Sequence, residues 1–323
     1  LQARGFDMTI IQTESESEQN LQLKTRGALN GYRDYEQLLK ELREIEAAYP
    51  GLCKLYDMGD TWGKQYLAQG NQNYDRFDHT IWALKVSDKV AVEEDEPSVY
   101  YMGEHHDRET ISLEVVMAVL YHILEGYGTD ETLTRRINDT QIWFLPLLNP
   151  NGHQVVTSKT DIWWPKKIRD NHQNRDFKTS SDSEDGVDQN RNDGFEWGLT
   201  GASDTPSAYN SQGPAPWSAP AIDAAKDFLD SHHFVAGISY HSSGELVLYP
   251  FGYANNVIAP DHDALSELAM KMAEATPGIP NEYGGFEHSH RHYDPGASWT
   301  LYPMMGDHCD LSLIHISEPT RQV

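Results

Sequence analysis

Apolar residues repeat at helical spacing in four parts of the chain. The first follows the i, i+1, i+4, i+7 spacing of an amphipathic helix, with apolar side chains at Leu38, Leu39, Leu42 and Ile45. The dipeptide Pro50-Gly51 would end this helix. Similar spacing predicts helices at residues 111–124, 218–229 and 263–275, and in the second of these Ser218 is the expected N-cap, with Pro220 in the first turn.

Short runs of β-branched, aromatic and aliphatic residues lie between these helices and predict strands. The runs occupy residues 80–86, 98–102, 140–148, 234–240 and 246–249. The run at 140–148 leads into Asn149-Pro150-Asn151-Gly152, which we interpret as a turn. Because strands alternate with helices, we predict an α/β fold: one domain with a mixed, mostly parallel twisted sheet and helices on both faces.

The polar ends of the chain set the expected limits of this domain. Residues 1–31 are polar and contain an alternating acidic run, which is typical of a poorly ordered leader or the remnant of a pro-segment. The folded domain is expected over residues 32–310. Long polar stretches at 159–217 and 277–310 predict loops, and loops at strand ends are where functional sites are commonly assembled.

The composition excludes two classes of partner. Fifty acidic and 25 basic side chains give a formal net charge of −25, so phosphate backbones would be repelled and nucleic-acid binding is not expected. No apolar run approaches the roughly 20 residues that cross a bilayer, so no membrane span is expected. We expect a monomer.

Three residues form a candidate metal site. His106 and Glu109 follow the predicted strand at 98–102, and a three-residue spacing places both side chains on one side of a helical turn. His241 follows the end of a second strand. Two histidines and one glutamate are the protein ligands of many catalytic zinc sites, in which the fourth position is open. His105 is the alternative first ligand, at a spacing of four residues from Glu109.

Five segments, taken in order, carry the pattern of a known family. They are GEHHDRE at 103–109, NPNG at 149–152, GVDQNRN at 186–192, GPAPWSAP at 213–220, and HS at 241–242 followed by LYPFGY at 248–253. Together they resemble the zinc carboxypeptidases related to pancreatic carboxypeptidase A. The resemblance covers about residues 32–310 and favours His106 over His105. It implies hydrolysis of the C-terminal peptide bond of peptides by a zinc-activated water.

The resemblance also implies roles for residues around the metal. His106, Glu109 and His241 would hold one Zn²⁺ per chain. Asp188 would accept a hydrogen bond from His106 and fix the tautomer of the ring.

A second group of residues would bind the substrate. Asn190 and Arg191 would hold the free α-carboxylate of the last residue, because the planar guanidinium pairs with a carboxylate through two hydrogen bonds. Arg108 would contact the peptide backbone further upstream, and Tyr302 would close over the terminal residue. The expected specificity pocket comprises Gly252, Ala297, Met304 and Cys309. It lacks an acid and favours apolar terminal side chains, although Asp307 is a nearby acid in the sequence.

The chain departs from the family pattern at the residue that stabilises the oxyanion. The family has Trp-Arg-Lys ahead of the third segment, and this chain has Trp164-Pro165-Lys166. The family arginine aligns with Pro165 or Lys166. Lys166 could place a positive charge at the developing oxyanion, and Arg169 is the alternative.

A second departure concerns the general base. In the family this glutamate follows an Asp-Trp pair, and Asp310 matches that aspartate, so the glutamate is expected beyond Val323. Residues 311–323 fit no expected strand or helix, and they resemble a translated sequencing adapter, so we predict a non-native tail. Glu318 is the alternative base. We therefore expect a metal site and a substrate site without the catalytic base.

Three functions fit these observations. The first is a carboxypeptidase that acts on peptide or protein C-termini. The second is an amidase or carboxypeptidase of the same family that acts on bacterial cell-wall peptides. The third is a zinc-holding peptide-binding module without catalysis, which the missing glutamate favours. The family and the acidic composition favour a secreted or periplasmic protein, although no signal peptide is present to identify.

Two other polar clusters could bind metal ions. His288, His290 and His292 alternate along a polar stretch and could hold a second metal. The acidic run from Asp182 to Asp185 could bind Ca²⁺ through oxygen ligands. We expect both to be solvated loops.

Overall fold

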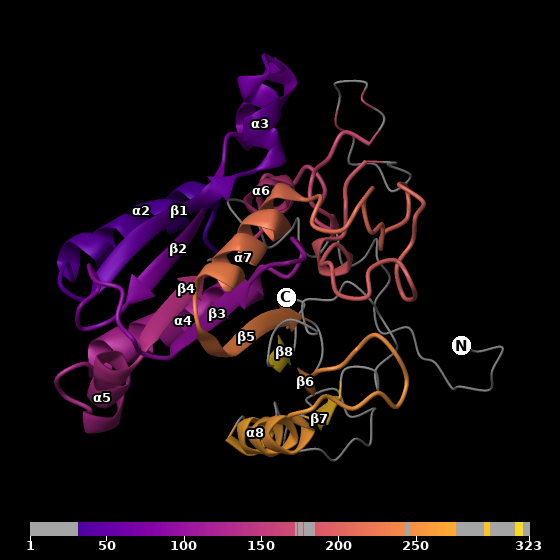
Figure 1. Cartoon of the computed structure of the whole chain (residues 1–323). Coiled ribbons are helices and arrows are strands. Elements are labelled where there is room, and N and C mark those ends of the chain that lie inside the picture. The colour runs from indigo at the N-terminus through magenta and orange to yellow at the C-terminus, as the bar shows by residue number, and fades with distance from the viewer. Residues whose placement is uncertain are drawn as a thin grey trace, which may run out of the picture.

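The computed structural model describes residues 32–171, 173, 177, 185–242 and 246–275, and the backbone of two further strands. These strands and six others form one sheet in the order β1-β2-β4-β3-β5-β8-β6-β7 (Figure 1). The strands are β1 (Cys53–Asp60), β2 (Thr80–Val86), β3 (Ser98–Gly103), β4 (Gln141–Leu145), β5 (Phe234–Ser242), β6 (Leu246–Tyr249), β7 (Asp294–Ala297) and β8 (Ile314–Glu318). The helices are α2 (Tyr35–Ala48), α3 (Trp62–Ala68), α4 (Ile111–Gly126), α5 (Glu131–Asp139), α6 (Pro150–Thr157), α7 (Pro220–Ser231) and α8 (His262–Ala275), with short 3₁₀ helices η2 (Gln72–Phe77) and η3 (Gln189–Arg191).

The sheet is mixed. Parallel pairing joins β3 to β4, β3 to β5, β5 to β8 and β6 to β7. Antiparallel pairing joins β1 to β2, β2 to β4 and β6 to β8. The predicted α/β domain with a mixed, mostly parallel sheet is confirmed.

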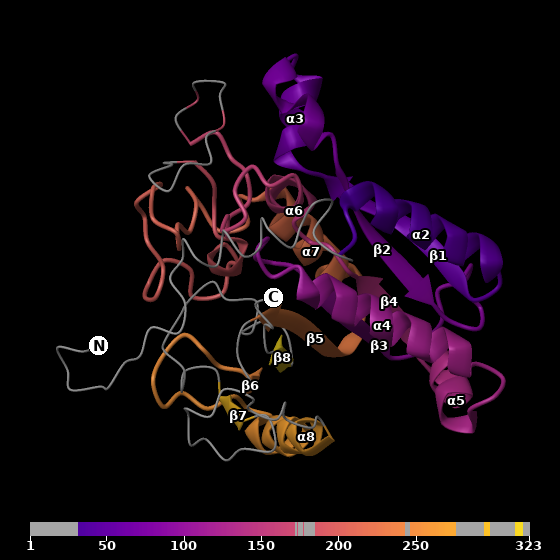
Figure 2. The ribbon, with the colours of Figure 1, turned by 180° about the vertical axis from the view of Figure 1, so that it is seen from behind.

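Helices cover both faces of the sheet because the strands place alternate side chains on opposite faces. In β4, Ile142 and Phe144 pack in one core with α2 and α4, whereas Trp143 and Leu145 pack in a second core with α7. Figure 1 shows α7 in front of the strands, and Figure 2, from behind, shows α2 and α4 on the opposite side. The apolar run at residues 142–145 therefore reflects burial on both sides.

Local signals fix where several helices begin. Asp34 caps α2: its side chain accepts a hydrogen bond from the Gln37 backbone, and the Gln37 side chain accepts one from Asp34 N in return. Two interpretations of this kind were wrong. Residues 149–152 form the start of α6 and not a turn outside a helix. Asn149 is the N-cap, a position that asparagine favours, and Pro150 is in the first turn, a position that proline favours.

The second wrong interpretation concerns the start of α7. Ala219, not Ser218, is the N-cap of this helix, and it makes no side-chain cap bond. Instead the side chain of Asn192 accepts a hydrogen bond from the Ala219 backbone at 2.8 Å and donates one to the Ser218 hydroxyl at 3.0 Å. Asn192, which lies in a distant loop, therefore makes the hydrogen bond at the start of α7, where we had expected Ser218 to cap the helix.

The sequence analysis did not anticipate β1, α3, α5, β7 or β8. The expectation that residues 311–323 fit no strand was wrong, since β8 pairs with β5 on one side and β6 on the other. The assignment of that segment as non-native stays a prediction. The expected leader at 1–31 lies outside the described residues. Within the described ranges no single helix has the length and hydrophobicity of a membrane span, and only α4 and α5 pass that test together, as a pair bent by 105°.

The core on the α4 face should tolerate truncation poorly. Replacing Leu120 of α4, which is 0% exposed, by Ala should lower the free energy of unfolding by about 2–5 kcal/mol, because the methyl groups leave a cavity. The same substitution at Leu268 of α8, 42% exposed, should change it by less than about 0.5 kcal/mol. Denaturant unfolding of both variants measures the difference, and equal losses would contradict the assigned packing.

Candidate metal centre

The candidate site lies at the carboxyl ends of two neighbouring parallel strands. β3 and β5 pair in a register that sets Gly103 opposite Tyr240. The chain leaves β3 after Gly103, and His241 is the next residue of β5. Loops and side chains at the carboxyl edge of a parallel sheet therefore converge there, as they do in many α/β proteins.

A tight turn between β3 and α4 presents the first two candidate ligands. The Glu109 backbone donates to His106 O at 3.0 Å, which brings the two side chains to the same side of the turn. Ser112 in the first turn of α4 fixes this geometry, since its hydroxyl donates to Glu109 O at 2.7 Å and accepts from Glu104 N at 2.9 Å.

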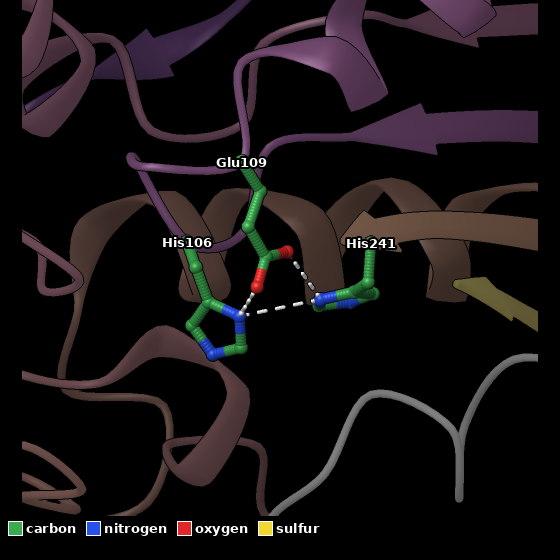
Figure 3. Close-up of side chains that lie close together, drawn as sticks. All are labelled: His106, Glu109 and His241. Atoms are coloured by element: carbon green, nitrogen blue, oxygen red, sulfur yellow. Dashed lines mark hydrogen bonds and ion pairs between the residues drawn. The ribbon is translucent and has the colours of Figure 1, made fainter. Parts of the chain in front are cut away.

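The three candidate ligands meet around one point (Figure 3). His106 Nδ1 lies 3.0 Å from Glu109 Oε1, and His241 Nδ1 lies 2.9 Å from Glu109 Oε2. The two Nδ1 atoms are 3.3 Å apart. One donor atom from each residue thus lies within 4.8 Å of the others, close enough to bind a single metal ion.

The chemistry of this donor set fits zinc. Two imidazole nitrogens and one carboxylate are a common ligand set of catalytic zinc. The other ring nitrogen of His106, Nε2, lies 3.2 Å from Asp188 Oδ1. A carboxylate at that position holds the proton on Nε2 and leaves Nδ1 to face the centre, which is the usual support for a metal-binding histidine.

The same carboxylates determine the charges of the site. Burial by itself would lower the pKa of His106, but the carboxylates of Glu109 and Asp188 raise it to about 10. Burial would raise the pKa of Glu109, and His106 and His241 hold it well below its usual range. The pKa of Asp188 is also lowered, since His106 and Arg191 outweigh its burial. Without a metal, His106 is therefore a cation between two anions.

His105 has a different environment from His106. Its Nδ1 lies 3.1 Å from the Ser239 hydroxyl, and its ring stacks on His241 with centroids 5.2 Å apart. It is fully buried and is absent from the cluster of candidate ligands. The geometry therefore supports His106 rather than His105 as the first ligand.

The segment that contains Asp188 also contains the predicted carboxylate-binding residues. Asp188 caps η3 by accepting a hydrogen bond from Asn190 N at 3.0 Å. Arg191 is 4% exposed, and its guanidinium donates to Gly201 O at 3.2 Å and to Asn190 O at 2.5 Å. Arg108 is exposed on the loop of residues 104–109, which we call the metal-binding loop after its two candidate ligands. The structure thus links Asn190 and Arg191 to His106 through Asp188.

The two candidates for oxyanion stabilisation differ in position. Lys166 is buried, donates to Pro206 O at 3.2 Å and lies over the Trp164 ring. Burial lowers its pKa to about 8, although Asp185 and Asp188 act in the opposite direction. Arg169 lies over the Trp62 ring and donates to Asn171 at 2.7 Å. Lys166 is therefore the more buried of the two candidates.

Several predicted residues cannot be placed. Those outside the described residues are Tyr302, Met304, Asp307, Cys309, Asp310, the three histidines from 288 to 292, and Asp182 to Glu184. Only the backbone is described for Ala297 and Glu318.

The sequence analysis missed three buried polar residues beside the ligands: Glu104, Asp107 and His153. Glu104 and Asp107 flank His106 in the sequence, and acidic residues next to a candidate ligand were a usable signal. His153 gave none, because its partner lies 49 residues away.

Comparisons with known proteins identify the family of this chain. The zinc carboxypeptidase family model matches residues 38–316. A zinc carboxypeptidase of Saccharothrix mutabilis subsp. capreolus is 28% identical over 257 residues, 75% of this chain and 53% of that protein. A protein of Uncinocarpus reesii described as an inactive metallocarboxypeptidase is 29% identical over 58% of this chain and 31% of its own length. The chain therefore spans about half the length of the first of these relatives and about a third of the second.

A solved structure shows the same fold. The crystal structure of carboxypeptidase A from Helicoverpa armigera superposes with a TM-score of 0.72 at 20% sequence identity, over 94% of this chain and 71% of that one. This chain and that carboxypeptidase therefore share one fold.

Zn²⁺ binding should release a proton from His106. Because His106 pairs with two carboxylates, the stabilisation from its charge in the metal-free protein is complete below pH about 6.5 and is lost as pH rises through about 10. At pH 8 the ring must lose its proton before Nδ1 can bind zinc, so about one proton should be released per ion. Calorimetry in buffers of different ionisation enthalpy measures this number. It should fall above pH 10, and no release at pH 8 would contradict the assignment.

Proposed function

The chain belongs to the zinc carboxypeptidase family, and we propose that it is a zinc-dependent carboxypeptidase that removes single residues from the C-termini of peptides and proteins. The observation that carries this proposal is the convergence of His106, Glu109 and His241 on one point, with Asp188 on the far nitrogen of His106. Zinc bound there would activate a water molecule as a nucleophile near neutral pH and polarise the scissile carbonyl.

Substrate selection would come from the loop that carries Asp188. Asn190 and Arg191 lie two and three residues after Asp188, so a carboxylate that they bind would lie close to the metal ligands. The Arg191 guanidinium donates hydrogen bonds to the backbone carbonyls of Gly201 and Asn190, which hold it in position. A fixed guanidinium suits the bidentate recognition of a terminal carboxylate. Arg108 would contact the peptide upstream, and Tyr302 would close over its last residue.

The expected pocket for the terminal side chain favours apolar residues. It comprises Gly252, Ala297, Met304 and Cys309, and none of these can neutralise a Lys or Arg side chain. We further propose that the protein acts as a monomer in a secreted or periplasmic form. The net charge of −25 is compatible with a soluble protein in such surroundings.

A second candidate is a zinc-holding peptide-binding module. The observation that favours it is the relative described as an inactive metallocarboxypeptidase. A third candidate is action on cell-wall peptides, which also present free carboxylates. All three use the same metal ligands and differ in what happens to a bound peptide.

Cleavage of an N-blocked dipeptide with an apolar terminal residue tests the primary function. The zinc-loaded protein should release the terminal amino acid, and a C-terminally amidated dipeptide should be resistant because it offers no carboxylate to Arg191. His106→Ala should lose zinc binding and cleavage, whereas His105→Gln should keep both, since His105 lies outside the ligand cluster. Mass spectrometry measures the products, and activity that survives His106→Ala would exclude the proposed centre.

Two further arms of the same assay separate the candidates. Preferential cleavage of a peptidoglycan stem peptide would indicate the cell-wall function, and zinc-dependent peptide binding without cleavage would indicate the module. A version extended by a family-like C-terminal segment tests the predicted absence of the base. If the extended and the original chains cleave at comparable rates, that prediction is wrong.

Lys166 should give the reaction an alkaline limit. Because only its charged form stabilises an oxyanion, kcat/KM should fall as pH rises through about 8. Lys166→Arg should keep activity above that pH because a guanidinium stays protonated, and Lys166→Met should lower kcat/KM across the whole range. Arg169→Ala is the matched control and should leave the profile unchanged. An alkaline limb that is identical in Lys166→Arg would exclude this role.

A further inference from the structure

The metal-binding loop contains a residue in an unfavourable conformation. Glu104 lies two residues before His106 and has φ +58°, the left-handed region that residues with a side chain rarely adopt. Its side chain is 0% exposed. A buried carboxylate is itself costly unless it is paired, so this position combines two destabilising features. Such features persist where the surrounding structure enforces them, and they concentrate at functional sites.

The partner of Glu104 is a histidine from another element. His153 of α6 is also 0% exposed, and its Nδ1 lies 2.5 Å from Glu104 Oε1. Its Nε2 lies 3.0 Å from the carbonyl oxygen of Arg33. Burial alone would lower the pKa of His153, but the Glu104 carboxylate and the Arg33 carbonyl raise it. Nε2 therefore donates a hydrogen bond to the Arg33 carbonyl, and a second hydrogen bond joins Nδ1 to the Glu104 carboxyl group.

The start of α6 contacts the metal-binding loop along its length. Leu148 N donates to Gly103 O at 3.2 Å, and the Asn149 side chain donates to His105 O at 3.5 Å. The Asp107 carboxylate lies over Gly152 so closely that a Cβ on this glycine would be 1.6 Å from Oδ2. The Glu104–His153 contact joins the same two segments through their side chains.

The pair also connects the loop to two further helices. Arg33, whose carbonyl accepts from His153, forms ion pairs with Glu41 of α2 and Glu114 of α4. Glu114 is in the first turn of α4, directly after the turn that carries Glu109. The metal-binding loop is thus fixed at Glu104 through His153. This contact is separate from that of Asp188, which touches the His106 side chain.

We propose that the buried Glu104–His153 pair positions the metal-binding loop and thereby increases the zinc affinity of a site whose ligands it does not touch. The inference rests on the proposed zinc-dependent function. Glu104 and His153 are positioning residues in this proposal, because they act on the metal through the backbone of residues 104–109.

Two substitutions at Glu104 separate positioning from backbone strain. Glu104→Gly and Glu104→Ala both remove the carboxylate, but only glycine adopts φ +58° without strain. In the metal-free protein the glycine variant should therefore have a higher melting temperature than the alanine variant. Both should bind Zn²⁺ about 10- to 100-fold more weakly than the unaltered protein, as variants of residues that orient ligands do. Competition with a chromophoric chelator measures the affinity, and Co²⁺ absorption reports the ligand geometry.

A double-mutant cycle tests whether the two residues act together. His153→Phe keeps a planar ring but no hydrogen bonds, and it should weaken Zn²⁺ binding to a similar extent. Glu104→Gly/His153→Phe should be no weaker than the more affected single variant, because both remove the same contact. Ile137→Ala, at a buried position in α5, is the control: it should lower the melting temperature and leave the zinc affinity unchanged.

The outcomes are distinct. If Glu104→Gly binds Zn²⁺ as tightly as the unaltered protein, the pair only offsets strain and the proposal is wrong. Multiplicative losses in the cycle would also overturn it. If His153→Phe does not fold, the two Glu104 variants still decide. If the unaltered protein itself fails to bind Zn²⁺, the proposed function fails and this inference falls with it.

Discussion

The parallel pairing of β3 with β5 is the contact on which the site depends. It joins residues 98–103 to residues 234–240, with a fixed register from Val99 to Gly103, and both strands end at the same edge. Glu109 and His241 are 132 residues apart in the sequence, yet the pairing brings their side chains to 2.9 Å. A shift of one residue in β5 would turn His241 to the opposite face of the sheet, since alternate residues of a strand face opposite ways. The apolar residues of both strands hold this register by packing between α4 and α7.

Charge pairing is the second constraint on the site. A chain with a net charge of −25 buries Glu104, Glu109 and Asp188 at one edge of its sheet. Each of these carboxylates lies against a histidine: Glu104 against His153, Glu109 against His106 and His241, and Asp188 against His106. Buried carboxylates are stable only with such partners. A divalent cation bound near Glu109 would add positive charge beside this carboxylate, where the three candidate ligand atoms lie close together.

The departures from the family pattern concern substrate turnover more than metal binding. The candidate ligands and Asp188 have the geometry that zinc needs, whereas the segment that aligns with the family arginine carries two buried lysines, Lys166 and Lys167. A lysine offers a point charge that burial can remove, and a guanidinium does not. The same fold and ligands can therefore support different degrees of catalysis in different members. The relative described as inactive, which shares 29% identity, is consistent with that view.

The sequence by itself determined the elements whose signals are local and the ligands whose spacing is short. The apolar positions of α2 and β2 follow helical and strand periods, and His106 and Glu109 lie within one turn. His241 was found from its place after a second strand, and the match to a family pattern added Asp188. Only the tertiary structure decided the remainder. Asn192 bonded the start of α7, where Ser218 was expected to cap, and β8 entered the sheet between β5 and β6. The Glu104–His153 contact likewise became visible only in the fold. In each case the deciding partner is distant along the chain, and periodicity and spacing carry information only about near neighbours.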